Sequence, residues 1–118
     1  MIRLLILVGL LLFSPLKTEA QVCPGLWSPI GLSSFETATV GATATKLPAI
    51  PSWAQLAVVT VEADAIRYID EASATPTGIL GHNVAAGSGF VVCGNAIGRI
   101  TLIRVTTDAT IMVSYYGG

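Results

Sequence analysis

The alternation of apolar and polar residues beyond about residue 35 predicts strands. Residues 55–63 read QLAVVTVEA, so the odd and the even positions are both largely apolar. A strand that is apolar on both faces is typical of the centre of a sheet. Residues 35–47 read FETATVGATATKL, rich in Thr and Val without an apolar i, i+3, i+4 stripe, and this predicts strands interrupted at Gly41.

The rest of the chain continues the β pattern. In residues 65–70, Ile66 and Tyr68 alternate with Arg67, which predicts a hairpin partner for residues 55–63 with one wet face. Turn residues separate three further predicted strands, at residues 90–93, 99–105 and 109–116. The stretch 71–89, mostly small and polar, predicts a long loop, and loops are where small β domains usually hold their binding residues.

These elements predict an all-β fold. We expect a single antiparallel β-sandwich or jelly-roll-like domain over residues 35–118, because short strands alternate with turns and no segment makes an amphipathic helix. Residues 21–34, rich in Pro, Gly and Ser, predict an extended N-terminal arm whose large apolar residues are Leu26 and Trp27. A chain of 118 residues has the length of one domain.

The first twenty residues have the pattern of a secretory signal peptide. Arg3 precedes an uninterrupted apolar run at residues 4–13, and Thr18 and Ala20 are placed for cleavage before Gln21. A membrane anchor would need a longer run, about 20 apolar residues, and a wrongly chosen start codon is the other alternative. We expect a secreted, extracellular domain with no stable membrane span after cleavage.

Two cysteines follow the cleavage site, Cys23 in the arm and Cys93 in a predicted strand. In an exported protein an even number of cysteines predicts a disulfide, and this one would close a loop of about 70 residues and stabilise by roughly 3 to 4 kcal/mol. Two unrelated buried thiols are the alternative. The bond would tie the arm to the domain.

The charge of the mature chain argues against nucleic-acid binding. From Gln21 onward there are four basic and six acidic residues, a net charge of −2. Phosphate binding needs a basic stripe, which four scattered bases do not supply.

The sequence offers little for catalysis, and we expect no catalytic or metal-ligating residue and no cofactor. His82 is the only histidine, and no Gly-x-Ser-x-Gly motif places a nucleophile near it. Glu62, Asp64, Asp70 and Glu71 gather around one predicted turn without the spacing of a calcium loop, so we interpret them as solvated.

Aromatic and polar side chains instead suggest an interaction surface. Aromatic rings can stack on a sugar or pack against a neighbouring subunit, although packing in the core or at an edge is the common use of any one of them. The candidate surface residues are Trp27, Trp53, Tyr68, His82, Asn83, Tyr115 and Tyr116.

Short motifs between residues 40 and 116 resemble small structural proteins of tailed-phage virions. The motifs are an Arg-Tyr strand, a Pro-Thr turn, a Gly-containing loop and a closing aromatic strand: Ile66-Arg67-Tyr68, Pro76-Thr77, Gly81, Gly87 and Val113-Ser114-Tyr115-Tyr116. The resemblance implies a head-decoration, head-fibre or minor-capsid protein that assembles without an active site. The signal peptide departs from that pattern, since phage particles assemble in the cytoplasm.

The chain is also similar to the Ig-like modules appended to secreted glycosidases, although Ile69-Asp70-Glu71-Ala72 lacks their glycine. Two functions are therefore open. One is a non-enzymatic structural protein with protein partners, as a homo-oligomer or on a capsid or other particle. The other is a secreted binding or adhesion module that recognises a glycan or a cell surface through the loop at residues 71–89.

Overall fold

The computed structural model describes residues 31–118 of the chain. The predicted signal peptide and most of the predicted arm lie outside the described residues. The described elements, in chain order, are β1 (Leu32–Val40), β2 (Ala54–Ala63), β3 (Ile66–Ile69), β4 (His82–Val84), β5 (Gly89–Cys93), α2 (Ala96–Arg99), β6 (Thr101–Arg104) and β7 (Ala109–Gly117).

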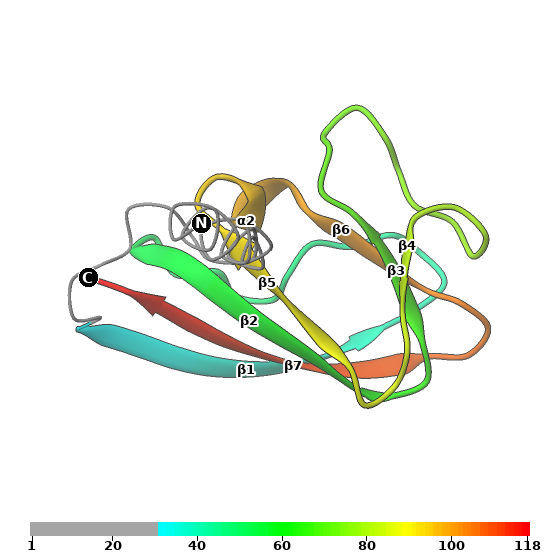
Figure 1. The fold of residues 1–118 in the computed structure, drawn as a ribbon, viewed down its shortest axis with the longest axis horizontal. Helices are drawn as coiled ribbons and strands as arrows, with labels where there is room; N and C mark the ends of the chain where they lie inside the picture. The colour runs from blue at the N-terminus through cyan, green and yellow to red at the C-terminus, as the bar shows by residue number, and fades with distance from the viewer. Residues whose placement is uncertain (1–30) are drawn as a thin grey trace, which may run out of the picture.

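The strands form two antiparallel sheets, and this confirms the predicted mostly β architecture (Figure 1). The larger sheet has four strands in the order β1-β7-β2-β5, so β2 is central, as its two apolar faces predicted. The smaller sheet has three strands in the order β4-β3-β6. The short helix α2 joins β5 of the larger sheet to β6 of the smaller one.

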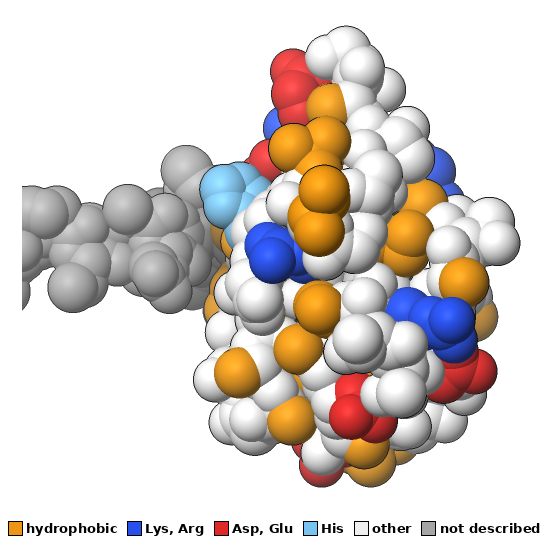
Figure 2. Space-filling model, turned by 90° about the vertical axis from the view of Figure 1, so that its right-hand side faces the viewer, with side chains coloured by type: hydrophobic (Ala, Val, Ile, Leu, Met, Phe, Trp, Pro, Cys, Tyr) orange, Lys and Arg blue, Asp and Glu red, His pale blue; other side chains and the backbone are white. Residues whose placement is uncertain are grey.

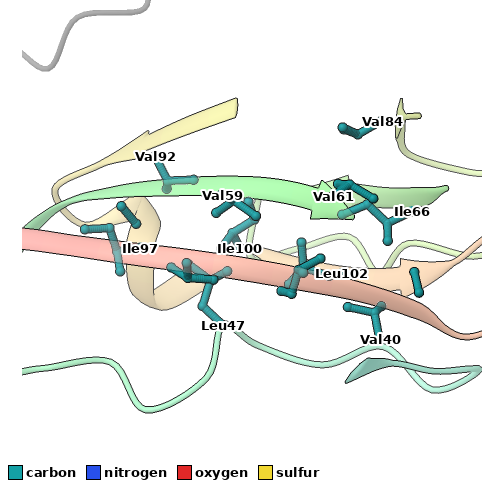
Figure 3. Packing of buried hydrophobic residues seen from close by; sticks show 14 of the residues in the cluster. Val40, Leu47, Val59, Val61, Ile66, Val84, Val92, Ile97, Ile100 and Leu102 are labelled. Atoms are coloured by element: carbon teal, nitrogen blue, oxygen red, sulfur yellow. The ribbon is translucent and has the colours of Figure 1, made fainter. Parts of the chain in front are cut away.

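The hydrophobic core joins the two sheets. On the larger sheet the alternation of β2 and β7 places Val59 beside Val113 and Val61 beside Ile111, all buried. Ile66 and Leu102 bring side chains from the smaller sheet into the same cluster (Figure 3). Successive side chains of a strand point to opposite faces of its sheet. Every second residue therefore faces the core, and the residues between them form the outer face.

The predicted hairpin between residues 55–63 and 65–70 is wrong. β2 pairs with β5 and β7, whereas β3 pairs with β4 and β6 in the other sheet. Asp64, between them, has a φ of 58°, a left-handed conformation that turns the chain from one sheet to the other. Both strands carry apolar residues that belong in the shared core, and two sheets bury them better than one hairpin would.

Two boundaries also differ from the prediction. β1 begins at Leu32, inside the segment expected to be an extended arm, and it ends at Val40, just before the expected break at Gly41. Beyond Gly41 the expected second strand is reduced to an isolated β-bridge at Thr45. The predicted loop at residues 71–89 contains the short strand β4, whose Val84 is buried opposite Ile66. Three residues with one core side chain give too little pattern to identify such a strand from sequence.

Candidate interaction surfaces

The outer face of the four-stranded sheet carries an apolar stripe. The strand registers align Phe35, Ser114, Val58 and Val91 across β1, β7, β2 and β5. Phe35 is 58% exposed at one end of this row and Val91 is 40% exposed at the other. We call Phe35, Val58 and Val91 the outer stripe.

The rows on either side of the outer stripe extend its apolar character. One neighbouring row contains Tyr116, Leu56 and Cys93, and the other contains Met112. Of these side chains none is fully exposed, and none belongs to the core. The sheet thus presents apolar surface on both of its faces, which soluble single domains rarely do without a partner.

Cys93 lies in β5 on this outer face, half-buried, in register with Leu56. Its predicted disulfide partner, Cys23, lies outside the described residues, as does Trp27. The Cys23 to Cys93 disulfide therefore stays a prediction.

A second candidate site is a small cleft at the open side of β5, where the two sheets diverge. The Tyr68 ring stacks on Phe90, with centroids 4.4 Å apart and planes 13° from parallel. The His82 ring lies 5.1 Å from Tyr68 at a tilt of 39°. The cleft has a volume of about 170 Å³, and Asp70, Cys93, Ala96 and Ile100 also line it.

The cleft holds its tyrosine in the neutral form. Burial raises the pKa of the Tyr68 hydroxyl, and the nearby Asp70 carboxylate raises that pKa further. Like any tyrosine, Tyr68 is a hydroxyl donor at neutral pH, and here it stands beside a carboxylate acceptor, a combination suited to hydroxyl-bearing ligands. Because Tyr68 and Phe90 cover each other's faces, neither ring offers its whole face to a sugar.

A third candidate site is a tight turn at residues 77–80, held from behind by Arg67. The Arg67 guanidinium donates to the carbonyl oxygens of Gly78 (3.0 Å) and Gly81 (2.9 Å). Reciprocal backbone hydrogen bonds between Thr77 and Leu80 close the turn. Gly81 has a φ of +123°, and a Cβ there would lie 3.0 Å from the Tyr68 carbonyl oxygen, so glycine is required.

The turn presents apolar side chains to solvent. Ile79 is 90% exposed and Leu80 is 54% exposed, whereas Pro76 at the base of the turn is buried. Figure 2 shows hydrophobic side chains among polar ones at the end of the molecule that carries these loops. A fixed turn that exposes isoleucine is preorganised to insert into a partner, because little loop entropy remains to be lost.

The residues predicted to form one interaction surface lie in several places. Tyr68 lines the cleft and His82 packs beside it without lining the cleft, while Asn83 is the cross-strand neighbour of Arg67. Tyr116 is on the outer face of the larger sheet. Trp53 is half-buried against the core, and its backbone is so close to Gly117 that a side chain at 117 would clash.

Tyr115 is not a surface residue. Its side chain is fully buried in β7, and its hydroxyl donates to the Pro48 carbonyl oxygen. Burial, with a smaller contribution from the Glu36 carboxylate, raises the pKa of Tyr115 to about 12.

The acidic residues make no metal site in the part of the chain that the structure describes, where no group of three or more potential ligands comes together. Glu71 accepts hydrogen bonds from the backbone N–H and the hydroxyl of Ser73, and these bonds lower the pKa of its carboxyl. Within residues 31–118, no helix is long and apolar enough to span a membrane.

Comparison with known proteins identifies no relative. No family model matches the sequence, and neither a curated protein nor a solved structure is significantly similar to the chain. The function must therefore be argued from the described residues themselves.

The sequence reasoning missed Phe35, Val91 and Ile79, which the structure places on the surface. Phe35 shares its face of β1 with Ser33, Thr37 and Thr39, whereas the opposite face ends in the apolar pair Ala38 and Val40, and this pair indicates the inner side. That signal was available in the sequence. No sequence signal would have revealed that the Arg67 side chain supports residues 77–81.

Proposed function

We propose that this domain is a non-enzymatic assembly protein that associates with further copies of itself, as a structural component of a virion or a similar particle. The observation that carries the proposal is the outer stripe, which places exposed Phe35 and Val91 in one row across the four-stranded sheet. We class the fold as a β-sandwich, since two antiparallel sheets share one core.

Burial of the outer stripe supports association. Moving a fully exposed aromatic or branched side chain out of water contributes roughly 1.5 to 3 kcal/mol to the free energy of association. A few such side chains, packed against the same side chains of a second copy, can therefore hold an interface. The surrounding charge is low: β5 and β7 contain no charged residue, Glu36 of β1 has the parity of the inner face, and Glu62 near the end of β2 is the strand charge on the outer side. Little electrostatic repulsion therefore opposes contact between two outer faces.

The test is to replace the outer stripe by polar residues. We expect the full chain to form oligomers in sedimentation-velocity measurements, and the double variant Phe35→Ser with Val91→Ser to sediment as a monomer. Ile79→Ser is the control, because it removes an even more exposed apolar side chain from another surface. A wild-type protein that remains monomeric at high concentration and never sediments with particles would refute the proposal.

The second candidate function is an exported binding module, and the Arg67-held turn favours it. Ile79 and Leu80 would insert into an apolar pocket of a partner, while the neighbouring cleft with Tyr68 and Asp70 would bind hydroxyl groups of a glycan. In a glycan-array or cell-binding assay, Ile79→Ser or Tyr68→Phe should then reduce binding about tenfold. Because Val91 also lines the cleft, binding that depends on Phe35 instead would favour the assembly protein.

A further inference from the structure

The outer edge of β1 is suited to pairing with another strand. β1 has nine residues and lies at one edge of the four-stranded sheet, where it pairs with β7 throughout without a register shift. Proteins usually protect such edges with proline, lysine, a bulge or a short strand. β1, LSSFETATV, has none of these, and its one protective feature is the inward-facing charge of Glu36, which an opposite strand could satisfy.

The other described edges are less suited to pairing. β5, β6 and β4 have five, four and three residues. β6 is also partly covered, because Thr45 and Leu102 exchange backbone hydrogen bonds along its outer side. β1 is thus the edge on which a second chain would form the most backbone hydrogen bonds.

One residue of β1 needs a partner that the described chain does not provide. The Ser34 hydroxyl is buried without a hydrogen bond, and it is the one such side-chain atom within residues 31–118. A buried polar group without a partner is destabilising by roughly 1 to 3 kcal/mol. Ser34 lies on the same side of β1 as Glu36, two residues along, whose carboxylate can accept a hydrogen bond.

We propose that two copies of this chain pair β1 against β1 in antiparallel fashion, about a two-fold axis at Phe35. The inference rests on the proposed assembly function and specifies the contact. In this register Glu36 of each copy faces Ser34 of the other, and a rotation of the Ser34 side chain towards the sheet edge would give each hydroxyl an acceptor. Phe35 faces Phe35, an aromatic pair of the kind that stabilises neighbouring strands.

Neighbouring registers are less favourable. An axis at Glu36 would set two carboxylates directly opposite each other, which is destabilising. An axis at Thr37 would set Glu36 against Ala38 and leave Ser34 opposite Val40, where neither polar group finds a partner. An axis at Ser34 shortens the paired segment to residues 32–36 and sets Leu32 against Glu36.

The pairing would also double the outer stripe. The two sheets would join into one sheet of eight strands, with the stripes of both copies meeting at the Phe35 pair. The combined apolar surface would then be larger than one copy presents, and the dimer would be the unit that assembles further.

A charge exchange at Ser33 and Thr37 tests the register. These residues face each other across the proposed axis, both are exposed, and neither belongs to the outer stripe. Ser33→Lys with Thr37→Lys would place lysine opposite lysine twice, and Ser33→Glu with Thr37→Lys would place glutamate opposite lysine twice. We expect the first double variant to raise the dimer dissociation constant about tenfold and the second to restore it, at low salt.

The outcomes separate this inference from the proposed function. If both double variants associate as the wild type does, while Phe35→Ser with Val91→Ser still abolishes association, the β1 register is wrong and the assembly function stands. If the wild type is monomeric, both are wrong. Ser34→Ala provides a second measurement: it should weaken dimerisation several-fold without lowering the thermal midpoint of the monomer, whereas a serine whose hydroxyl stabilises the monomer would lower that midpoint when replaced.

Discussion

Tyr115 combines deep burial with a polar group, and a single hydrogen bond to Pro48 compensates for that burial. Sequence reasoning had placed this residue on the surface because aromatic residues near a strand end can serve either use. The alternation of β7 does indicate that Tyr115 is buried. Ile111, Val113 and Tyr115 lie on one face of the strand, and the first two are core residues.

The raised pKa of Tyr115 predicts a loss of stability in alkali. A tyrosine in the unfolded chain ionises near 10, whereas Tyr115 in the fold ionises at about 12. The stabilisation of the fold by the protonated Tyr115 hydroxyl is therefore fully present below pH 10, and it is lost as the pH rises from 10 through 12. Tyr115→Phe loses the hydrogen bond to the Pro48 carbonyl oxygen, so it should be less stable than the wild type by roughly 1 to 2 kcal/mol at pH 8. It has no group to ionise at residue 115, so its stability should lack this dependence on alkaline pH.

Urea unfolding of both proteins at pH 8, 11 and 12 measures this difference. We expect the gap in free energy of unfolding between wild type and Tyr115→Phe to narrow, or reverse, as the pH rises. A gap of constant size at all three values would mean that the Tyr115 hydroxyl is not held in a buried, neutral state.

At the scale of elements, the central position of β2 was predictable and its pairing was not. Two apolar faces identify a strand covered on both sides, and β2 indeed lies between β7 and β5. The short link through Asp64 favoured a hairpin with β3, because adjacent strands in sequence commonly pair. That inference failed because a left-handed residue lets a short link change sheets, and sequence alone does not indicate the φ of Asp64.

Buried and exposed positions of the same sheet should differ sharply in their tolerance of charge. Val59→Asp places an unpaired carboxylate in the centre of the core, at a cost of several kcal/mol against a total stability of about 5 to 15 kcal/mol. We expect this variant to be unfolded, as judged by circular dichroism. Val91→Asp, the same change at an exposed position of β5, should keep a thermal midpoint close to that of the wild type; equal midpoints for the two variants would contradict the assignment of the inner face.

At the scale of the whole molecule, the sequence predicted the mostly β class and most strand positions. The candidate surfaces were harder to predict from the sequence, because they depend on which residues the strand register places in one row. Phe35 and Val91 are 56 positions apart in the sequence and become members of one stripe through two intervening strands. Periodicity describes one strand at a time, so it cannot reveal such a row.

The predicted export and disulfide can be tested together by the intact mass of the protein from its natural source, with and without reductant. We expect a chain that begins at Gln21 and is lighter before reduction by the mass of two hydrogen atoms, as a Cys23 to Cys93 bond requires. A chain that retains Met1 and carries thiols would contradict both predictions and would favour assembly in the cytoplasm.

The position of β7 determines when the fold can form. β7 follows every other described strand in the sequence, yet it lies between β1 and β2 and supplies the partner that each needs. Until the ribosome has made residues 109–117, the larger sheet lacks β7, the strand between β1 and β2. Without β7, β1 has no partner among the described strands. The larger sheet can therefore be completed only after this segment has been synthesised, an order of events that would suit the predicted export.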